Sequence, residues 1–223
     1  SDRPAAAPCP QEQNGPPPLS FAQQRLWFLE QWEPGNKAYL LPYAWRLTGP
    51  LTIEALEASL TTLVARHESL RTSVGLVDGQ PVQIIAPSRP VTLSLQDLTS
   101  FSSTQCEEHV QRFIDNEQQQ PLDLRIGPLW RGQLLRLRSE EHIFLLTFHH
   151  LITDGWSMGL FFQELQTLYT AQAIGQSAFL PPNLLNYSDF AIWQRQCLQG
   201  DTLERQLTYW RSKLADAETS LDL

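Results

Sequence analysis

The sequence predicts an α/β (α+β) fold in which a mixed β-sheet packs against amphipathic helices. Strand-like apolar segments alternate along the chain with segments of helical periodicity, an order typical of this class. One run, IFLLTF at 143–148, is apolar on both faces and predicts a central strand. With 223 residues, 42% of them hydrophobic, the chain can bury the core of one large domain or two small ones.

The first 18 residues differ in composition from the rest of the chain. They hold six of the sixteen prolines and almost no large apolar side chains. Such a segment cannot bury enough surface to offset its ordering entropy. We therefore expect a proline-rich interdomain linker at 1–18, a globular unit at 19–223, and a chain that is a piece of something longer.

The first half of the globular unit predicts a helix, a strand and a second helix. Residues 19–32 have helical spacing, with Ser20 as the N-cap and EPG as the stop. Residues 38–49 predict a strand closed by Gly49. Residues 52–72 predict one long amphipathic helix, and if it holds throughout, Arg71 lies beside its apolar stripe.

The second half predicts two strand pairs and three helical segments. Strands at 72–77 and 81–87 flank a DGQ turn, and strands at 129–139 and 141–150 can pair as antiparallel neighbours. A polar helix is expected at about 104–119 and another from 154–157 to about 173. A longer helical stretch, broken at QGD, is expected from Tyr187 onward.

Charge and cysteine usage exclude several classes of function. A net charge of −8 and a pI of about 5.1 disfavour a general nucleic-acid or anionic-membrane surface. The three cysteines are widely spaced, without a CxxC pair, and fit a reduced chain. No signal peptide and no apolar run of membrane-spanning length is visible. These features predict a cytoplasmic protein that does not bind membranes.

The stretch HHLITDG, residues 149–155, contains the candidate catalytic residues. Consecutive strand residues point to opposite faces, so only one of His149 and His150 can face a site. Asp154 and Gly155 follow where the strand gives way to a helix, whose N-terminal amides suit a developing oxyanion. A strand-end histidine, an aspartate and nearby amides would together make an acyl-transfer site.

Three other interpretations of this stretch are possible. A histidine on an apolar strand is usually a satisfied core residue, and Asp154 alone would most often be a helix N-cap. A zinc site is the third, but adjacent strand histidines diverge and no third ligand has suitable spacing. We therefore expect no metal here.

HHxxxDG resembles the motif of condensation domains of non-ribosomal peptide synthetases and of related acyltransferases with the chloramphenicol-acetyltransferase fold. Three further stretches resemble other motifs of the condensation family in the same order, and PLDLRIGPLWRGQLLRL at 121–137 is also similar in style. The three stretches are SFAQQRLW at 20–27, RHESLRT at 66–72 and YSDFAIW at 187–193. DGWSM at 154–158 is more similar to condensation domains than to epimerisation domains. Among condensation domains, it is more similar to those that join two L-residues.

The resemblance implies that 19–223 is the N-terminal lobe of a two-lobe domain whose active site lies in a tunnel between the lobes. The C-terminal lobe is absent, so the isolated lobe is expected to be inactive. The full domain would form a peptide bond between a donor aminoacyl or peptidyl thioester and an acceptor amine. Both substrates would be carried on 4′-phosphopantetheine arms of upstream and downstream carrier domains beside an adenylation domain. No cofactor would be bound by this lobe itself.

The resemblance also assigns roles to single residues. His150 would contact the attacking amine, either as a base or by positioning it, and His149 would be its packing neighbour. Gly155 would permit close backbone approach to the reacting centre. Asp154 would pair with an arginine, and Arg71 is favoured over Arg66, because a charge beside the apolar stripe needs a carboxylate.

The other motif residues are expected to have structural roles. The aromatic residues Trp27, Tyr187 and Trp193 are expected in the core, and Arg25 in a salt bridge or a structural tie.

Two other functions remain open from the sequence. The first is a stand-alone acyltransferase of the same fold that uses coenzyme A. The second is a catalytically dead lobe that only docks carriers or tailoring enzymes.

Overall fold

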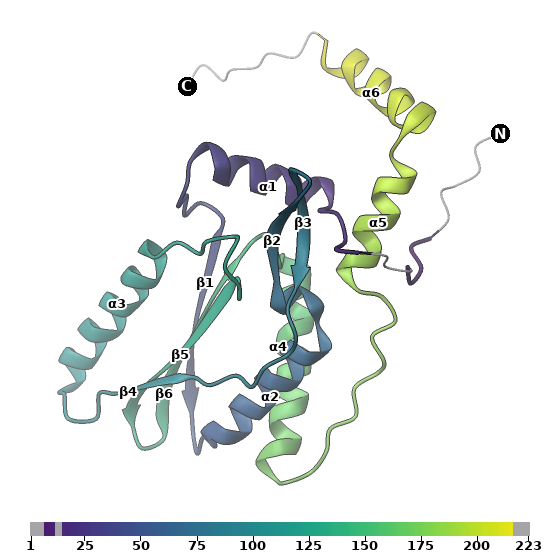
Figure 1. The fold of residues 1–223 in the computed structure, drawn as a ribbon. Helices are drawn as coiled ribbons and strands as arrows, with labels where there is room; N and C mark the ends of the chain where they lie inside the picture. The colour runs from purple at the N-terminus through teal and green to yellow at the C-terminus, as the bar shows by residue number, and fades with distance from the viewer. Residues whose placement is uncertain (1–6, 12–14, 216–223) are drawn as a thin grey trace.

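A four-stranded sheet lies at the centre of the molecule in the computed structural model, which describes residues 7–11 and 15–215 (Figure 1). Its order is β1 (Leu40–Thr48), β6 (Glu141–His149), β5 (Trp130–Arg138) and β4 (Ser94–Asp97). β6 pairs antiparallel with β1 and β5, and β4 is parallel to β5. The sheet is therefore mixed, with IFLLTF in an inner strand, and both predictions are confirmed.

Helices cover both faces of this sheet, which explains why β6 is apolar throughout. α2 (Ile53–Arg66) and α4 (Gly155–Ala173) lie together on one face, and α3 (Ser103–Gln119) lies on the other (Figure 1). Alternate strand residues divide between two cores. Leu134, Phe144, Leu146 and Phe148 join the core under α2 and α4, whereas Leu135, Leu137, Ile143 and Leu145 join the core under α3.

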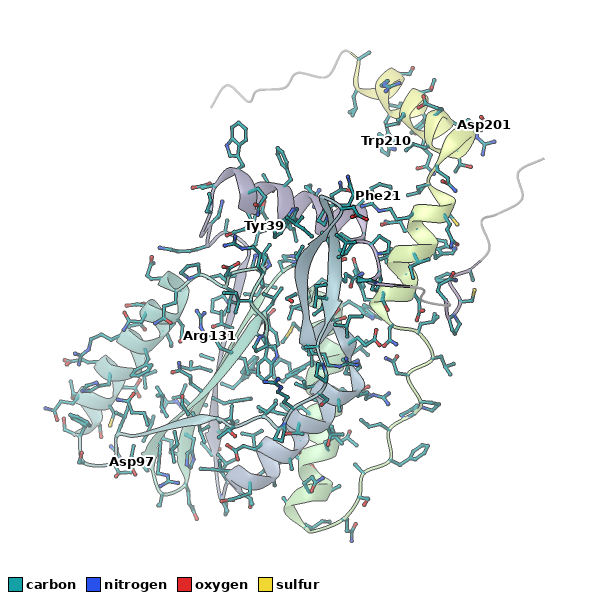
Figure 2. The ribbon with its side chains drawn as sticks, in the orientation of Figure 1. Phe21, Tyr39, Asp97, Arg131, Asp201 and Trp210 are labelled. Carbon is teal, nitrogen blue, oxygen red and sulfur yellow. The ribbon has the colours of Figure 1, made fainter. Side chains whose placement is uncertain are left out.

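The start of α1 (Phe21–Trp32) contacts a helix from the C-terminal part of the described chain. Ser20 and Gln23 form a capping box there. The Phe21 N–H donates to Gln194 Oε1 of α5 (Tyr187–Cys197) at 2.9 Å, and the Arg195 guanidinium lies 4.1 Å from the Phe21 ring centroid. Figure 2 labels Phe21 at the start of α1. The contact between Phe21 and Gln194 joins the last turn of α5 to the first turn of α1, and at the other end of α5 the Tyr187 hydroxyl lies 2.9 Å from Ser20 Oγ.

The last helix, α6 (Gly200–Leu214), extends away from the sheet (Figure 1). It has no buried residue, and the side chains of Tyr209, Trp210 and Leu214 are all more than half exposed. The break at QGD between α5 and α6 confirms the predicted interruption.

β2 (Thr72–Val77) and β3 (Gln80–Ile85) form a separate two-stranded hairpin. Asp78 and Gly79 have φ of 50° and 76°, as a two-residue turn of type I′ requires. Part of the expected linker lies along this hairpin, because the Gln83 N–H donates to the Pro17 carbonyl at 2.8 Å.

The predicted helix at 52–72 is too long. α2 ends at Arg66, with His67 in an extended conformation, and a short 3-10 helix η1 (Glu68–Arg71) follows. Thr72 already pairs with Ile85 in the hairpin, so the chain has to leave the helix before it. The expectation that Arg71 lies on the stripe of α2 is therefore wrong. The short strand β4 was not predicted either.

The three cysteines are free, as expected. Of the helices in the described ranges, none is both long enough and apolar enough to cross a membrane.

Candidate active site

His149 is the last residue of β6, and its side chain is buried. Its Nδ1 accepts a hydrogen bond from the Leu151 N–H at 3.0 Å. Burial, with a smaller contribution from His150, lowers the pKa of His149 to about 4. The imidazole is therefore neutral at pH 7, and it holds the turn that follows the strand.

His150 lies one residue beyond the strand and is exposed. Its N–H donates to the Tyr39 carbonyl at 2.8 Å, which ties this position to the segment before β1. A second tie fixes the same turn, because Gln23 Nε2 donates to the Leu151 carbonyl at 3.3 Å. The two histidines thus occupy different environments, one inside the core and one at the surface.

His150 lines an open hollow of about 210 Å³. Its wall comes from α1, the turn after β6, the first turn of α4 and the start of α5. The lining includes Gln23, Arg25, Tyr39, His150, Asp154, Ser157 and Tyr187. Small-molecule sites typically have volumes of about 300–1,000 Å³, so this wall would accommodate only part of a substrate.

Asp154 is the N-cap of α4, which confirms the alternative interpretation of this residue. Its Oδ1 accepts from the Ser157 N–H at 2.8 Å and from the Ser157 hydroxyl at 2.7 Å. These hydrogen bonds lower the pKa of Asp154. Because its carboxylate already faces the amides of this helix end, the expectation that they would stabilise an oxyanion is not supported.

The expected pairing of Arg71 with Asp154 is wrong. Arg71 NH1 donates to the Ala86 carbonyl at 2.7 Å, and NH2 lies 3.8 Å from Glu68 Oε1. The physical reason is the early end of α2, which places Arg71 in η1 and away from the hollow at His150.

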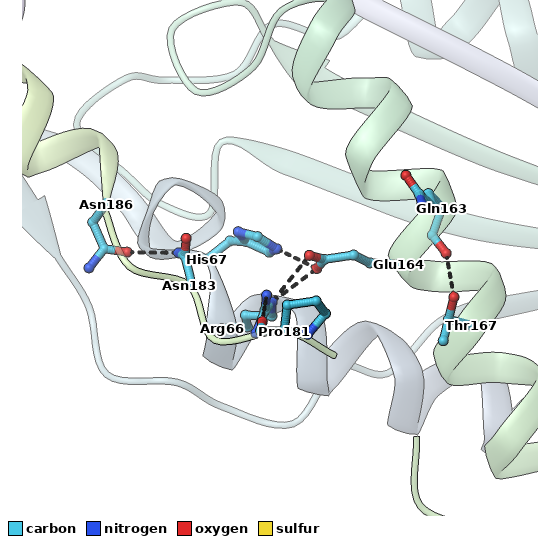
Figure 3. Close-up of polar contacts among 8 residues, drawn as sticks. All are labelled: Arg66, His67, Gln163, Glu164, Thr167, Pro181, Asn183 and Asn186. Atoms are coloured by element: carbon cyan, nitrogen blue, oxygen red, sulfur yellow. Dashed lines mark hydrogen bonds and ion pairs between the residues drawn. The ribbon is translucent and has the colours of Figure 1, made fainter. Parts of the chain in front are cut away.

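Arg66 lies in a polar cluster with His67, Glu164 and Pro181 (Figure 3) and does not line the hollow at His150. Its Nε donates to Glu164 of α4 at 3.1–3.2 Å, and its NH2 donates to the Pro181 carbonyl. His67 Nε2 lies 2.6 Å from Glu164 Oε2. This cluster joins α2, α4 and the loop that leads to α5, so Arg66 is not a solvated helix end.

The remaining motif residues have mixed outcomes. Trp27 is buried as expected, and Trp193 is half-buried. Tyr187 is 38% exposed and lines the hollow, and its hydroxyl lies 2.9 Å from Ser20 Oγ, so its expected place in the core is wrong. A side chain at Gly155 would meet no heavy atom of this chain within 4 Å.

Sequence reasoning missed Gln23 and Tyr39 in the wall and left Arg25 between two structural roles. Gln23 and Arg25 stand in the SFAQQRLW stretch, whose resemblance to a family motif was the available signal. Tyr39 contributes through its backbone carbonyl, for which the sequence gives no signal. Within the described ranges, no group of three or more His, Cys, Asp or Glu residues could hold a metal ion.

The fold and the position of the strand-end histidine define a chloramphenicol-acetyltransferase-like lobe. The family model of the condensation domain matches residues 13–223, so the chain belongs to the condensation-domain family. It is 44% identical over 214 residues to one of the linear gramicidin synthase proteins of Brevibacillus parabrevis, covering 96% of this chain and 3% of that synthase. It is 42% identical to the phosphinothricin tripeptide synthetase PhsC of Streptomyces viridochromogenes, covering 99% of this chain and 21% of that protein.

Solved structures of two related domains have the same fold over about half of their length. The first condensation domain of the calcium-dependent antibiotic synthetase matches with a TM-score of 0.81 at 25% identity, over 93% of this chain and 49% of that one. The X-domain in its complex with OxyB from teicoplanin biosynthesis matches with a TM-score of 0.88 at 30% identity, over 100% and 48%. The chain therefore spans about half the length of these domains.

Proposed function

We propose that this chain is the N-terminal lobe of a peptide-bond-forming condensation domain in a non-ribosomal peptide synthetase. The observation that carries the proposal is the placement of His150. It stands at the end of the central strand, outside the core, in an open hollow beside α4. The complete domain would join a donor aminoacyl or peptidyl thioester to the amine of an acceptor aminoacyl thioester. Both would arrive on phosphopantetheine arms of partner carrier domains.

His150 would work on the attacking amine. An α-amino group has a pKa of about 7.7–8.0, so a fraction is already neutral near pH 7. His150 would position that amine and accept its proton as the tetrahedral intermediate forms. His149 is buried and its Nδ1 is occupied, so it would not take part directly.

A non-catalytic docking lobe is a second candidate. It is favoured by the structural likeness to an X-domain, which is described in a complex with another protein. The accessible His150 in its own hollow favours the catalytic function instead.

The test uses His150→Ala in the complete two-lobe domain, with carriers loaded with donor and acceptor. Dipeptidyl thioester is followed by mass spectrometry. We expect product formation to fall by about 100-fold or more, as for loss of a general base, with an unchanged melting temperature. Wild-type turnover by the variant would contradict the role of His150. A wild-type domain that makes no product would favour the docking lobe.

A further inference from the structure

A second and larger hollow, of about 590 Å³, lies between the start of β5 and the segment 86–93 that follows β3. It shares no lining residue with the hollow at His150. Its apolar part is formed by buried side chains that belong to the main core: Val64, Leu70, Leu93 and Trp130. Its polar part includes Arg71, Ser73, Arg89, Thr92 and Arg131.

The charge of this arginine hollow is unusual for the chain. Acidic residues outnumber basic ones by 24 to 16 in the sequence, yet three arginines and no aspartate or glutamate line this hollow. A wall with an excess of positive charge attracts anions.

Two of the three arginines keep N–H groups without a hydrogen-bond partner, although Arg71 forms an ion pair with Glu68. Arg131 is paired with Glu117 at 2.5 Å. The nearest carboxylate oxygen to Arg71 is that of Glu68, at 3.8 Å, which is beyond hydrogen-bond distance. Arg71 Nε is buried without a hydrogen-bond partner, and Arg89 is exposed with no hydrogen bond or ion pair among the described residues. Arg71 Nε itself is inaccessible, so a ligand would meet the NH2 group of Arg71, which makes no hydrogen bond, and the guanidinium of Arg89.

The position of Arg71 is fixed before any ligand arrives. Its NH1 donates to the Ala86 carbonyl, which holds the guanidinium at the entrance to segment 86–93. A planar guanidinium matches two oxygens of a phosphate group, and a fixed one loses less entropy on binding. Trp130 and Leu93 form part of the apolar wall of the hollow, although they are only 7% and 5% exposed.

We propose that the arginine hollow binds an organic phosphate, with the phosphate group between Arg71 and Arg89 and the apolar part against Trp130. Two guanidinium groups with free donors favour a phosphate over a singly charged carboxylate. The site is separate from His150, so it does not depend on the proposed acyl transfer.

The probe is phenyl phosphate, titrated into the purified 15N-labelled protein at low salt. The Nε–Hε signal of Arg71 is followed by NMR and assigned by its loss in Arg71→Lys. Benzoate and benzyl alcohol serve as the carboxylate and the neutral control ligands. We expect a saturable shift with phenyl phosphate, a weaker one with benzoate, and none with benzyl alcohol. Added salt should weaken binding, because charges near the surface are screened.

Arg89→Gln is the decisive variant. Arg89 is exposed and makes no contacts of its own, so the fold should be retained. Loss of a charged hydrogen bond should weaken phenyl phosphate binding by about tenfold or more. Arg112→Gln, at an exposed position on α3, is the matched control and should bind as wild type. No saturable shift, equal binding of benzyl alcohol, or equal weakening by both substitutions would overturn the proposal.

Two sources could supply the phosphate, a free phosphate ester or the phosphodiester of a pantetheine arm. Titration of 4′-phosphopantetheine distinguishes them. Tighter binding than phenyl phosphate would assign the site to a carrier-borne arm, and weaker binding to a free ester. Either result supports a phosphate site. Only the assignment to a carrier rests on the proposed function.

Discussion

Neighbouring residues in HHLITDG have different tasks because each lies in a different solvent environment. We expect His149→Phe to lower the free energy of unfolding by about 1–3 kcal/mol, because the ring volume is retained but the Leu151 N–H loses its acceptor in a buried place. Chemical denaturation of the wild type and the variant measures this difference. His150→Phe is the control, since the His150 side chain is exposed. If both variants unfold alike, the structural role of His149 is wrong.

Asp154 contributes a helix cap whose strength depends on pH. The Ser157 hydrogen bonds lower its pKa in the folded protein, so the folded state binds this proton less tightly than the unfolded chain. The contribution of the Asp154 cap to the free energy of unfolding is therefore fully present above the pKa of this group in the unfolded chain, about 3.9. It is lost as the pH falls through the lower pKa in the folded protein.

Asp154→Asn and Asp154→Ala separate the charge from the cap. Asparagine still caps a helix but carries no charge, so it should cost about 0.3–1 kcal/mol at pH 7 and progressively less as the pH falls through the lowered pKa of Asp154. Alanine should cost about 0.5–2 kcal/mol at pH 7. Urea titrations of the wild type and both variants at pH 7 and at pH 2.5–3 measure these differences in the free energy of unfolding. A loss of 3–5 kcal/mol for alanine would instead indicate a buried ion pair.

At the scale of elements, Glu164 is the residue that joins α2 to α4. Its carboxylate receives Arg66 and His67 from the end of α2, and Arg66 in turn reaches the Pro181 carbonyl. Glu164→Gln should cost about 1.5–3 kcal/mol, because hydrogen bonds to charged groups are lost in a place that is only 17% exposed. Thermal unfolding tests this, with Glu108→Gln on the outer face of α3 as the matched control. If the two variants have the same melting temperature, Glu164 does not stabilise the contact between α2 and α4.

Most elements were predictable from the sequence because their signals are local. Period-two alternation, Asp-Gly at the turn and capping residues at Ser20 and Asp154 each act over a few positions. The end of α2 was not predictable, because the apolar spacing of the helix continues through Leu70 while strand pairing of Thr72 overrides it. The four-residue β4 was missed because its pairing partner, β5, is distant in sequence.

The candidate site shows the same limit. Strand alternation, a local feature, indicated that only one of His149 and His150 faces the site, and the resemblance to the HHxxxDG motif assigned that place to His150. The Arg71–Asp154 pair failed because it assumed a helix that does not extend that far. Tyr187 enters the hollow only through contacts such as that between Phe21 and Gln194, which join residues 173 positions apart in the sequence. No local pattern reports a contact of that kind.

At the scale of the whole molecule, the lobe has both faces of its sheet covered, but its hollow is open. The two cores are formed entirely by residues of this chain, so we expect the lobe to fold alone. The hollow at His150 holds only about 210 Å³, and solved relatives are about twice as long. Orientation of bound reactants can supply about 7–11 kcal/mol of the barrier, so under the proposed function an open half-wall would orient its thioester substrates poorly.

We therefore expect the 223-residue lobe to be folded and inactive. The test combines the lobe with carriers loaded with donor and acceptor, under conditions where a complete condensation domain forms dipeptidyl thioester, and compares the two by mass spectrometry. Circular dichroism and a cooperative melting transition establish folding, so a lack of product cannot be attributed to denaturation. Turnover by the lobe near that of the complete domain would show that His150 and its own hollow suffice. Product that appears only when the second half of the domain is present would show that orientation across both walls, and not the histidine alone, limits the reaction.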